Sequence, residues 1–235
     1  MNYAIIAAGN GSRLYQEGIK TPKPLVKISG ISLIERLIGL FIKNNPESIS
    51  IIINEEMTEV KEFLNSLHLN IPFNLVVKTT PSSMHSLGEL AEFLEGKRFC
   101  LTTVDTIFKE QEFIEYIHTF ENDKTSDGLM AVTEYIDDEK PLYVSTYPNS
   151  MLISDFSDNI DENKKKYISG GIYCLNPNAL NSLRSCIDQG MYKMRNYQRR
   201  LIKDGLKLKI YPFGKIIDVD HVEDISKAEN FLNKQ

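Results

Sequence analysis

Apolar runs alternate with helical periodicity over the first 120 residues, and this alternation is the feature that most constrains the fold. Runs that are apolar throughout are typical of buried strands, and the segments between them place apolar side chains at helical spacing. The predicted strands lie at 3–8, 48–54, 72–78 and 98–105, and the predicted helices at 31–44, 55–68, 86–96 and 111–120. Such alternation favours parallel strands joined by right-handed crossovers, with helices on both faces of the sheet.

The pattern changes after residue 126, where short strand-like runs follow one another between polar turns. The runs lie at 128–136, 141–147, 151–156 and 167–175. They predict a small antiparallel insertion over about 128–175, after which a helical stretch (about 179–203) and a strand (206–213) resume the earlier pattern. We therefore predict one domain over 1–235, of the α/β class, with a Rossmann-like, mostly parallel sheet, helices on both faces and this antiparallel insertion.

Charge and cysteine content limit the partners and the compartment. The 235-residue chain carries a net charge of −5, so no overall basic field attracts nucleic acid, and a bound phosphate has to be held locally. The three cysteines show no metal-ligand spacing, which suits a reducing compartment. No apolar run reaches the length of a membrane span. We expect a cytoplasmic protein that binds neither nucleic acid nor membrane.

A glycine turn follows the first predicted strand. Gly9 and Gly11 allow close approach of the backbone N–H groups to an anion, and Arg13 adds a planar fork of donors. A mononucleotide P-loop is excluded, because it needs Lys-Ser/Thr where this chain has Ser-Arg. A dinucleotide fingerprint, and with it an oxidoreductase, stays as an alternative: Leu14 replaces its third small residue, and Glu35 has the right separation but lies in a helical pattern.

The stretch "AIIAAGNGSRL", followed by "TPKPLVKI", resembles the amino-terminal signature of the nucleotidyltransferases. That group includes sugar-1-phosphate nucleotidyltransferases, phosphocholine cytidylyltransferases and molybdopterin-type guanylyltransferases. The resemblance implies transfer of a nucleotidyl group from a nucleoside triphosphate (NTP) to a small phosphorylated acceptor, with a sugar 1-phosphate as the leading acceptor, and release of pyrophosphate. It implies catalytic roles for Arg13 and Lys23. It assigns nucleotide binding to Ala7, Ala8, Gly9, Gly11, Ser12, Ser83 and Ser86.

A transferase acting on phosphates also needs a cation, and Mg²⁺ held by carboxylates is the expected cofactor. Asp105 ends an apolar strand, where ligands of such sheets gather, and resembles the family's strand-end aspartate. The late segment "IIDVDHVEDISKAENFL" resembles the family's second acidic segment and supplies Asp218 and Asp220. We favour Asp218 as the direct ligand, with Asp220 binding through water or positioning the loop.

The acceptor side has weaker signals. "YISGGIYCLNP" resembles the family's glycine-containing acceptor strand, which implies that Gly170 and Gly171 line the acceptor site. The family's acceptor-phosphate lysine is missing from its usual place, and the run Lys164–Lys166 is a candidate substitute or an ordinary solvated loop. The base, the oligomeric state (a homo-oligomer is compatible with the sequence), a phosphocholine-type acceptor and a non-catalytic nucleotide-sugar-binding role stay open.

Overall fold

One twisted sheet of nine strands forms the centre of the computed structural model, which describes residues 1–137, 140–160 and 166–233. Four parallel neighbours form one half, in the order β6, β1, β4, β5. Their bounds are β6 (Phe99–Thr103), β1 (Asn2–Ala7), β4 (Ser48–Ile53) and β5 (Phe73–Val77). The other half consists of β8 (Gly128–Thr133), β9 (Tyr143–Thr146), β10 (Ile153–Ser157), β11 (Tyr167–Leu175) and β12 (Leu208–Phe213).

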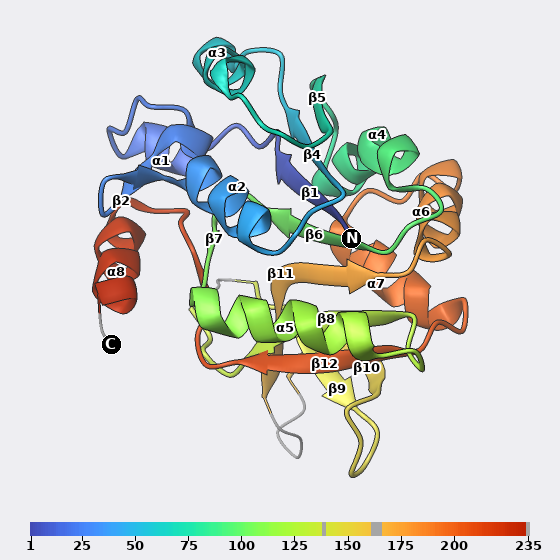
Figure 1. Ribbon diagram of the computed structural model, residues 1–235. Helices are drawn as coiled ribbons and strands as arrows, with labels where there is room; N and C mark the ends of the chain where they lie inside the picture. The colour runs from blue at the N-terminus through green and yellow to red at the C-terminus, as the bar shows by residue number, and fades with distance from the viewer. Residues whose placement is uncertain (138–139, 161–165, 234–235) are drawn as a thin grey trace.

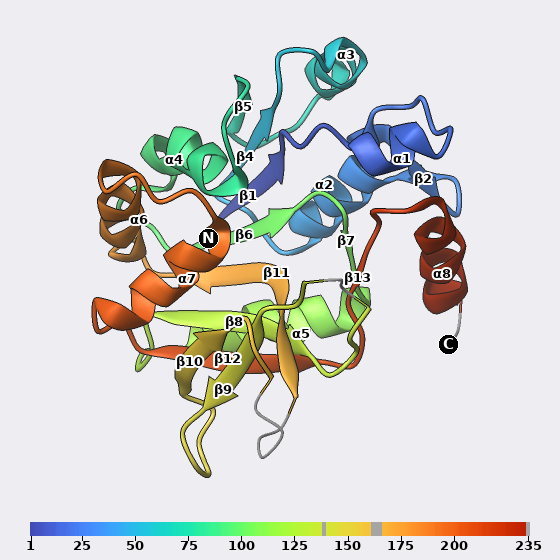
Figure 2. The same cartoon turned by 180° about the vertical axis from the view of Figure 1, so that it is seen from behind.

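Helices cover both faces of the sheet, so the predicted architecture is confirmed (Figures 1 and 2). One face carries α2 (Leu33–Lys43), α3 (Thr58–Ser66) and α5 (Glu110–Asn122), and the other carries α4 (Ser83–Leu94), α6 (Ala179–Asp188) and α7 (Met194–Lys203). Along β1, Tyr3 and Ile5 enter one core while Ala4 and Ile6 enter the other. Burial on both faces explains why this strand is apolar throughout.

The predicted insertion is an extension of the central sheet rather than a layer of its own. Strand β11 runs antiparallel to β6 through Ile172–Leu175, and its start, Tyr167–Ile168, pairs with β9 instead. Between these two parts the register of β11 against β8 shifts, and Gly171 has a φ of +73°. A glycine without a Cβ adopts this left-handed conformation readily, so the bulge lets one strand serve two neighbours.

The stretch predicted as helical over about 179–203 divides into α6 and α7. Gly190, with a φ of +67°, follows the first helix and breaks its backbone pattern. Short elements next to the glycine turn have too little periodicity to be predicted from sequence. They are α1 (Ser12–Gln16), a 3₁₀ turn η1 (Lys23–Leu25), the β2–β3 hairpin (Lys27–Ile28 and Ile31–Ser32) and the pair β7 (Thr106–Ile107) with β13 (Ile217–Asp218).

The final helix, α8 (Val222–Asn233), lies at the edge of the molecule beside β2 (Figures 1 and 2). The Ser29 backbone N–H donates to Glu229 Oε1 at 2.8 Å, which ties this late helix to an early hairpin. The β13 segment before it is therefore brought next to the residues that follow β1 and β6. Among the helices in the described ranges, none has both the length and the apolar character that crossing a membrane requires.

Candidate active site

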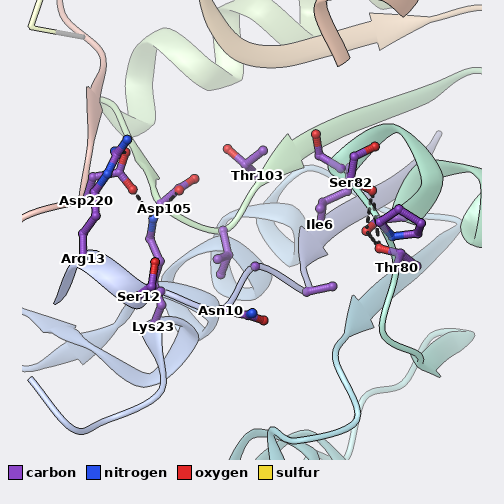
Figure 3. A pocket seen from close by; sticks show the side chains of 17 residues that line it. Ile6, Asn10, Ser12, Arg13, Lys23, Thr80, Ser82, Thr103, Asp105 and Asp220 are labelled. Atoms are coloured by element: carbon purple, nitrogen blue, oxygen red, sulfur yellow. Dashed lines mark hydrogen bonds and ion pairs between the residues drawn. The ribbon is translucent and has the colours of Figure 1, made fainter. Parts of the chain in front are cut away.

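A cavity of about 490 Å³ opens at the carboxyl ends of β1 and β6 (Figure 3). The glycine turn forms one wall, the start of α4 another, and the strand end at Asp105 closes the floor. The lining residues are Ile6, Ala8, Gly9, Asn10, Gly11, Ser12, Arg13, Lys23, Thr80, Pro81, Ser82, Ser83, Ser86, Thr103, Val104, Asp105 and Asp220. Ligands of open parallel sheets bind at this edge, so the cavity lies where the topology predicts.

Glycine is needed at the two positions of the turn for different structural reasons. Gly11 has a φ of +58°, and a Cβ built on it would lie only 2.9 Å from Lys23 Cβ. This position therefore needs glycine both for its backbone conformation and for the approach of Lys23. A Cβ on Gly9 would meet no atom within 4 Å, so Gly9 leaves space open in the cavity.

Lys23 joins carboxylates from two distant parts of the chain. Its Nζ lies 2.5 Å from Asp105 Oδ2 and 2.6 Å from Asp220 Oδ1, and its side chain is only 9% exposed. Arg13 Nη1 lies 2.9 Å from Asp220 Oδ2 (Figure 3). The pairing of β13 with β7, and a 3.0 Å bond from Val219 N to the Asp105 carbonyl, bring the late segment to the strand end.

These contacts shift the pKa values of the paired groups in the direction that favours their charged forms. Burial alone would lower the pKa of Lys23, but the charges of Asp105 and Asp220 raise it above its usual value. Burial alone would raise the pKa of Asp105, but Lys23, with a further hydrogen bond from Thr103, lowers it below its usual value. Both members of the pair are therefore charged at neutral pH.

Asp218 has a different environment from Asp220. Displacement of water by the surrounding protein, and then the nearby charges of Asp105 and Asp220, raise the pKa of Asp218 to about 8. Its carboxyl group still meets solvent, because it lies on the wall of a second cavity. Asp218 is thus close to the lysine-bridged pair without being one of the two carboxylates that Lys23 binds.

Hydroxyl groups gather where α4 begins. Ser86 Oγ lies 2.6 Å from Thr80 Oγ1, and Ser82 Oγ lies 2.9 Å from His85 Nδ1. Ser82 and Ser83 line the cavity beside the N–H groups of the first helical turn. This end can therefore both donate hydrogen bonds and accept them, as recognition of a polar ring requires.

The second cavity, of about 840 Å³, lies between the end of β8, the bulge of β11 and the start of α8. It shares Arg13 and Asp220 with the first cavity. Its other lining residues are Glu17, Thr133, Tyr135, Asp137, Ile168, Ser169, Gly170, Ile216, Ile217, Asp218, His221, Val222, Glu223, Asp224, Ser226 and Lys227. The two cavities thus meet at one ion pair, which could bind the reacting ends of two ligands.

The structure brings together most of the site residues predicted from sequence, with three exceptions. The side chain of Ala7 is buried in the core and does not line the first cavity, because it faces the opposite side of β1 from Ile6 and Ala8, which do line it. Gly170 lines the second cavity but Gly171 does not; Gly171 serves the bulge. Asp220, rather than Asp218, meets Lys23.

Several predictions have no structural counterpart to report. Lys164 and Lys165 lie outside the described residues, so the acceptor role of Lys164–Lys166 stays a prediction. Within the described ranges, no three His, Cys, Asp or Glu side chains converge on one point. Sequence reasoning missed Asn10, Thr80 and Thr103, whose only signal is their place within two residues of the end of a predicted strand.

The chain matches a family of proteins over almost all of its length. The family model for nucleotidyl transferase matches residues 3–235. The bifunctional protein GlmU of Methanococcus maripaludis is 26% identical over 242 residues, which cover 100% of this chain and 55% of that protein. The chain therefore spans about half the length of the curated relatives that it matches.

Solved structures share the fold. A candidate glucose-1-phosphate thymidylyltransferase of Bacillus anthracis, in complex with a sucrose, superposes with a TM-score of 0.84 at 22% identity, covering 100% of this chain and 96% of that one. The inositol-1-phosphate CTP transferase of T. maritima gives a TM-score of 0.76 at 18% identity, covering 98% and 97%.

The fold and the position of the cavity define an α/β protein with a candidate ligand site at the carboxyl edge of its sheet. The chain belongs to the nucleotidyl transferase family. This membership removes the dinucleotide-dependent oxidoreductase that the glycine turn left open. In keeping with it, Leu14 is buried in the core, and Glu35 lies inside α2 rather than at a strand end.

Proposed function

We propose that the protein transfers a nucleotidyl group from an NTP to a small phosphorylated acceptor, with a sugar 1-phosphate as the leading acceptor, and releases pyrophosphate. The observation that carries the proposal is the group of charges where the two cavities meet: Arg13 and Asp220 border both cavities, and Lys23, in the first cavity, lies within 2.6 Å of both Asp105 and Asp220. Family membership and the activities in the names of the similar proteins support the same reaction class.

The reaction is an in-line displacement. An oxygen of the acceptor phosphate forms a bond to the α-phosphorus of the NTP, and the bond from that phosphorus to the bridging β-oxygen breaks. Pyrophosphate leaves with the electron pair. No general base is required, because a phosphomonoester is already ionised near neutral pH. The task of the protein is therefore positioning and charge neutralisation.

The two cations and the glycine turn divide this task. The backbone N–H groups from Gly9 to Arg13 face the triphosphate, and glycine at positions 9 and 11 permits the close approach. Arg13 neutralises charge that moves onto the leaving pyrophosphate, and Lys23 lies where the α-phosphate is attacked. The hydroxyls at the start of α4, Ser83 and Ser86 among them, face the base and ribose.

The residues at the ion pair fit a divalent cation. Two carboxylates from different segments converge here and bind the Lys23 ammonium group, so oxygen ligands of opposite charge are gathered at this point. Oxygen ligands with phosphate partners are what Mg²⁺ prefers, and the proposed ligands are Asp105 and Asp220 rather than Asp218. When bound, Mg²⁺ supplies charge neutralisation to the phosphates.

A cytoplasmic location is part of the proposal, because NTPs are available there. The cysteines at 100, 174 and 186 are free and buried, in keeping with a reducing compartment.

The test is an assay of pyrophosphate release over the common NTPs and a panel of phosphorylated acceptors: hexose 1-phosphates, inositol 1-phosphate and phosphocholine. We expect turnover only with a divalent cation present, strongest with a sugar 1-phosphate. Turnover confined to phosphocholine would favour the cytidylyltransferase alternative. Tight nucleotide binding with no pyrophosphate released from any pair would contradict a catalytic role and favour a binding domain. A variant with Asp105→Asn serves as the inactive control.

A further inference from the structure

Asn54 is a buried polar residue directly after β4, beside the point where β1 ends. Only 3% of its surface is exposed. Its Nδ2 donates to the Ala8 carbonyl at 3.3 Å, and its Oδ1 accepts from the Glu56 N–H at 3.0 Å. A carbonyl can only accept and a backbone N–H can only donate, so these two partners fix which end of the Asn54 amide is nitrogen.

The orientation of Asn54 in turn fixes that of Asn10. The Asn54 Nδ2 makes a second contact, at 3.2 Å, with the side chain of Asn10. Because Asn54 presents a donor there, the atom of Asn10 that meets it must be the acceptor, Oδ1. The Nδ2 of Asn10 is thereby placed on the other side of its amide, away from Asn54.

Asn10 lines the first cavity. In Figure 3 it lies between the charged end, with Arg13 and Lys23, and the hydroxyl end, with Thr80 and Ser82. A ligand that spans both ends, as a nucleoside triphosphate does, passes this point. A donor held in a fixed direction at this place forms its hydrogen bond without the loss of rotamer freedom that a mobile side chain suffers.

We propose that Asn54 is a positioning residue of the nucleotide site: it orients the amide of Asn10 so that Asn10 Nδ2 donates a hydrogen bond to the bound nucleoside triphosphate. The proposal rests on the proposed function for the identity of the ligand. The residue that follows β4 thus orients a side chain of the glycine turn, although β4 is not part of the glycine motif.

The decisive variant is Asn54→Asp, which keeps the shape but replaces the donor by an acceptor. The Asn10 amide then turns to donate to the introduced carboxylate, and presents its oxygen to the nucleotide. Loss of one neutral hydrogen bond predicts a rise in KM for the NTP of about threefold to tenfold, with KM for the acceptor unchanged. Asn74→Asp is the matched control: Asn74 Nδ2 donates to Ser50 Oγ at 3.1 Å on the strand next to its own, and a serine hydroxyl can reverse its role.

A double-mutant cycle with Asn10→Ala separates this orienting effect from the negative charge that the Asn54→Asp change adds. We expect Asn54→Asp to raise KM for the NTP much less in the Asn10→Ala background than in the parent. An equal rise in both backgrounds would overturn the proposal, as would an unchanged KM in a folded Asn54→Asp protein. If Asn54→Asp does not fold, the exposed Asn10→Ala decides alone: an unchanged KM for the NTP overturns the proposal.

The readouts keep the two proposals distinguishable. If the parent releases pyrophosphate, the cycle is measured in KM. If the parent binds an NTP without turnover, the proposed function fails, and the same cycle measured as the dissociation constant of that NTP by calorimetry still tests Asn54. A cycle that shows coupling in the dissociation constant supports the positioning role whatever the reaction.

Discussion

The two cavities that meet at Arg13 and Asp220 are built in different ways. The first is walled by a continuous turn, a strand end and the start of one helix, with glycines, short hydroxyl side chains and two cations. The second is walled by long charged side chains from segments far apart in the chain. A cavity walled by backbone suits a ligand whose phosphates are the same whatever its base. A cavity walled by side chains from many segments can differ between related proteins, and so can fit different acceptors.

The two cavities also differ in charge, because carboxylates outnumber cationic side chains in the second one. Apart from Asp218, whose raised pKa leaves it largely protonated near pH 7, the carboxylates of this cavity are Glu17, Asp137, Asp220, Glu223 and Asp224, against Arg13 and Lys227 as cationic side chains. Lys227 is held by its neighbours, at 2.8 Å from Glu223 and 3.2 Å from both Asp137 and Asp224. A phosphate is therefore repelled from the outer part of this cavity and is best held at the shared wall, near Arg13 and Lys23.

The largest expected effect comes from Asp105→Asn, which removes a charge that both ligands depend on. We expect kcat to fall by about a thousandfold or more, as when a principal electrostatic contact to a transition state is lost. Pyrophosphate release at saturating substrates measures it, with the exposed Asp155→Asn on β10 as control. Turnover equal to that of the parent would remove Asp105 from the site.

A smaller effect is expected from Arg13→Lys. A charged hydrogen bond contributes about 1.5–3 kcal/mol, so Arg13→Ala should lower kcat/KM roughly tenfold to a hundredfold. Arg13→Lys should recover little of it, because an ammonium cannot reproduce the guanidinium fork. If the lysine variant matched the parent, Arg13 would act only as a diffuse charge shared by the two cavities.

Two glycine substitutions, one in each cavity, should affect the binding of different ligands. A Cβ on Gly9 projects into open space of the first cavity, so Gly9→Ala should raise KM for the NTP and leave the unfolding midpoint unchanged. A Cβ on Gly170 would lie 2.2 Å from Ile216 Cδ1. Gly170→Ala should therefore push Ile216 into the second cavity, raise KM for the acceptor and cost about 1 kcal/mol or more of stability.

Steady-state KM values and thermal unfolding of both variants check this pair. A change of the same KM in both proteins would mean that the cavities do not bind separate ligands.

The smallest effect is expected from changing the three lysines at 164–166 to Gln. The sequence alone motivates this prediction. Each exposed contact contributes on the order of 1 kcal/mol or less, so KM for the acceptor should rise a few fold at low salt and less at high salt. Acceptor titrations at two salt concentrations measure it, and an unchanged KM at low salt would return the run to an ordinary solvated loop.

The sequence predicts the first cavity better than the second, because the wall of the second comes from segments far apart in the chain. Continuous apolar runs identified the buried strands, and the glycine motif with Lys23 identified the first cavity, because neighbours in sequence are neighbours in that wall. Ala7 was assigned to the nucleotide site together with Ala8, but its side chain lies on the opposite face of β1 and is buried in the core. Gly171 was assigned to the acceptor although its φ of +73° serves a bulge.

The late segment shows why the rest could not be predicted. Strand β13 is only two residues long and ends at Asp218. Beyond it the chain has no strand period, so the sequence could not tell which of Asp218 and Asp220 turns toward Lys23. One local and one distant carboxylate hold the backbone here: Asp224 Oδ2 accepts from the N–H groups of Asp220 and His221, and Glu17 Oε2 accepts from that of Val222.

The bridge from Lys23 to Asp220 also has a consequence for the order in which the protein is made. At about 5–20 residues per second, the 197 positions between these two residues take roughly 10–40 s to translate. Asp105 is added 82 positions after Lys23, and from then until residue 220 the growing chain has its glycine turn and Asp105 but lacks the second carboxylate. A ribosome-bound chain that stops before residue 217 therefore cannot assemble the paired carboxylates. The loop that carries Lys23 is made early, but it gains Asp220 as a partner only after the segment that follows β13 has been synthesised.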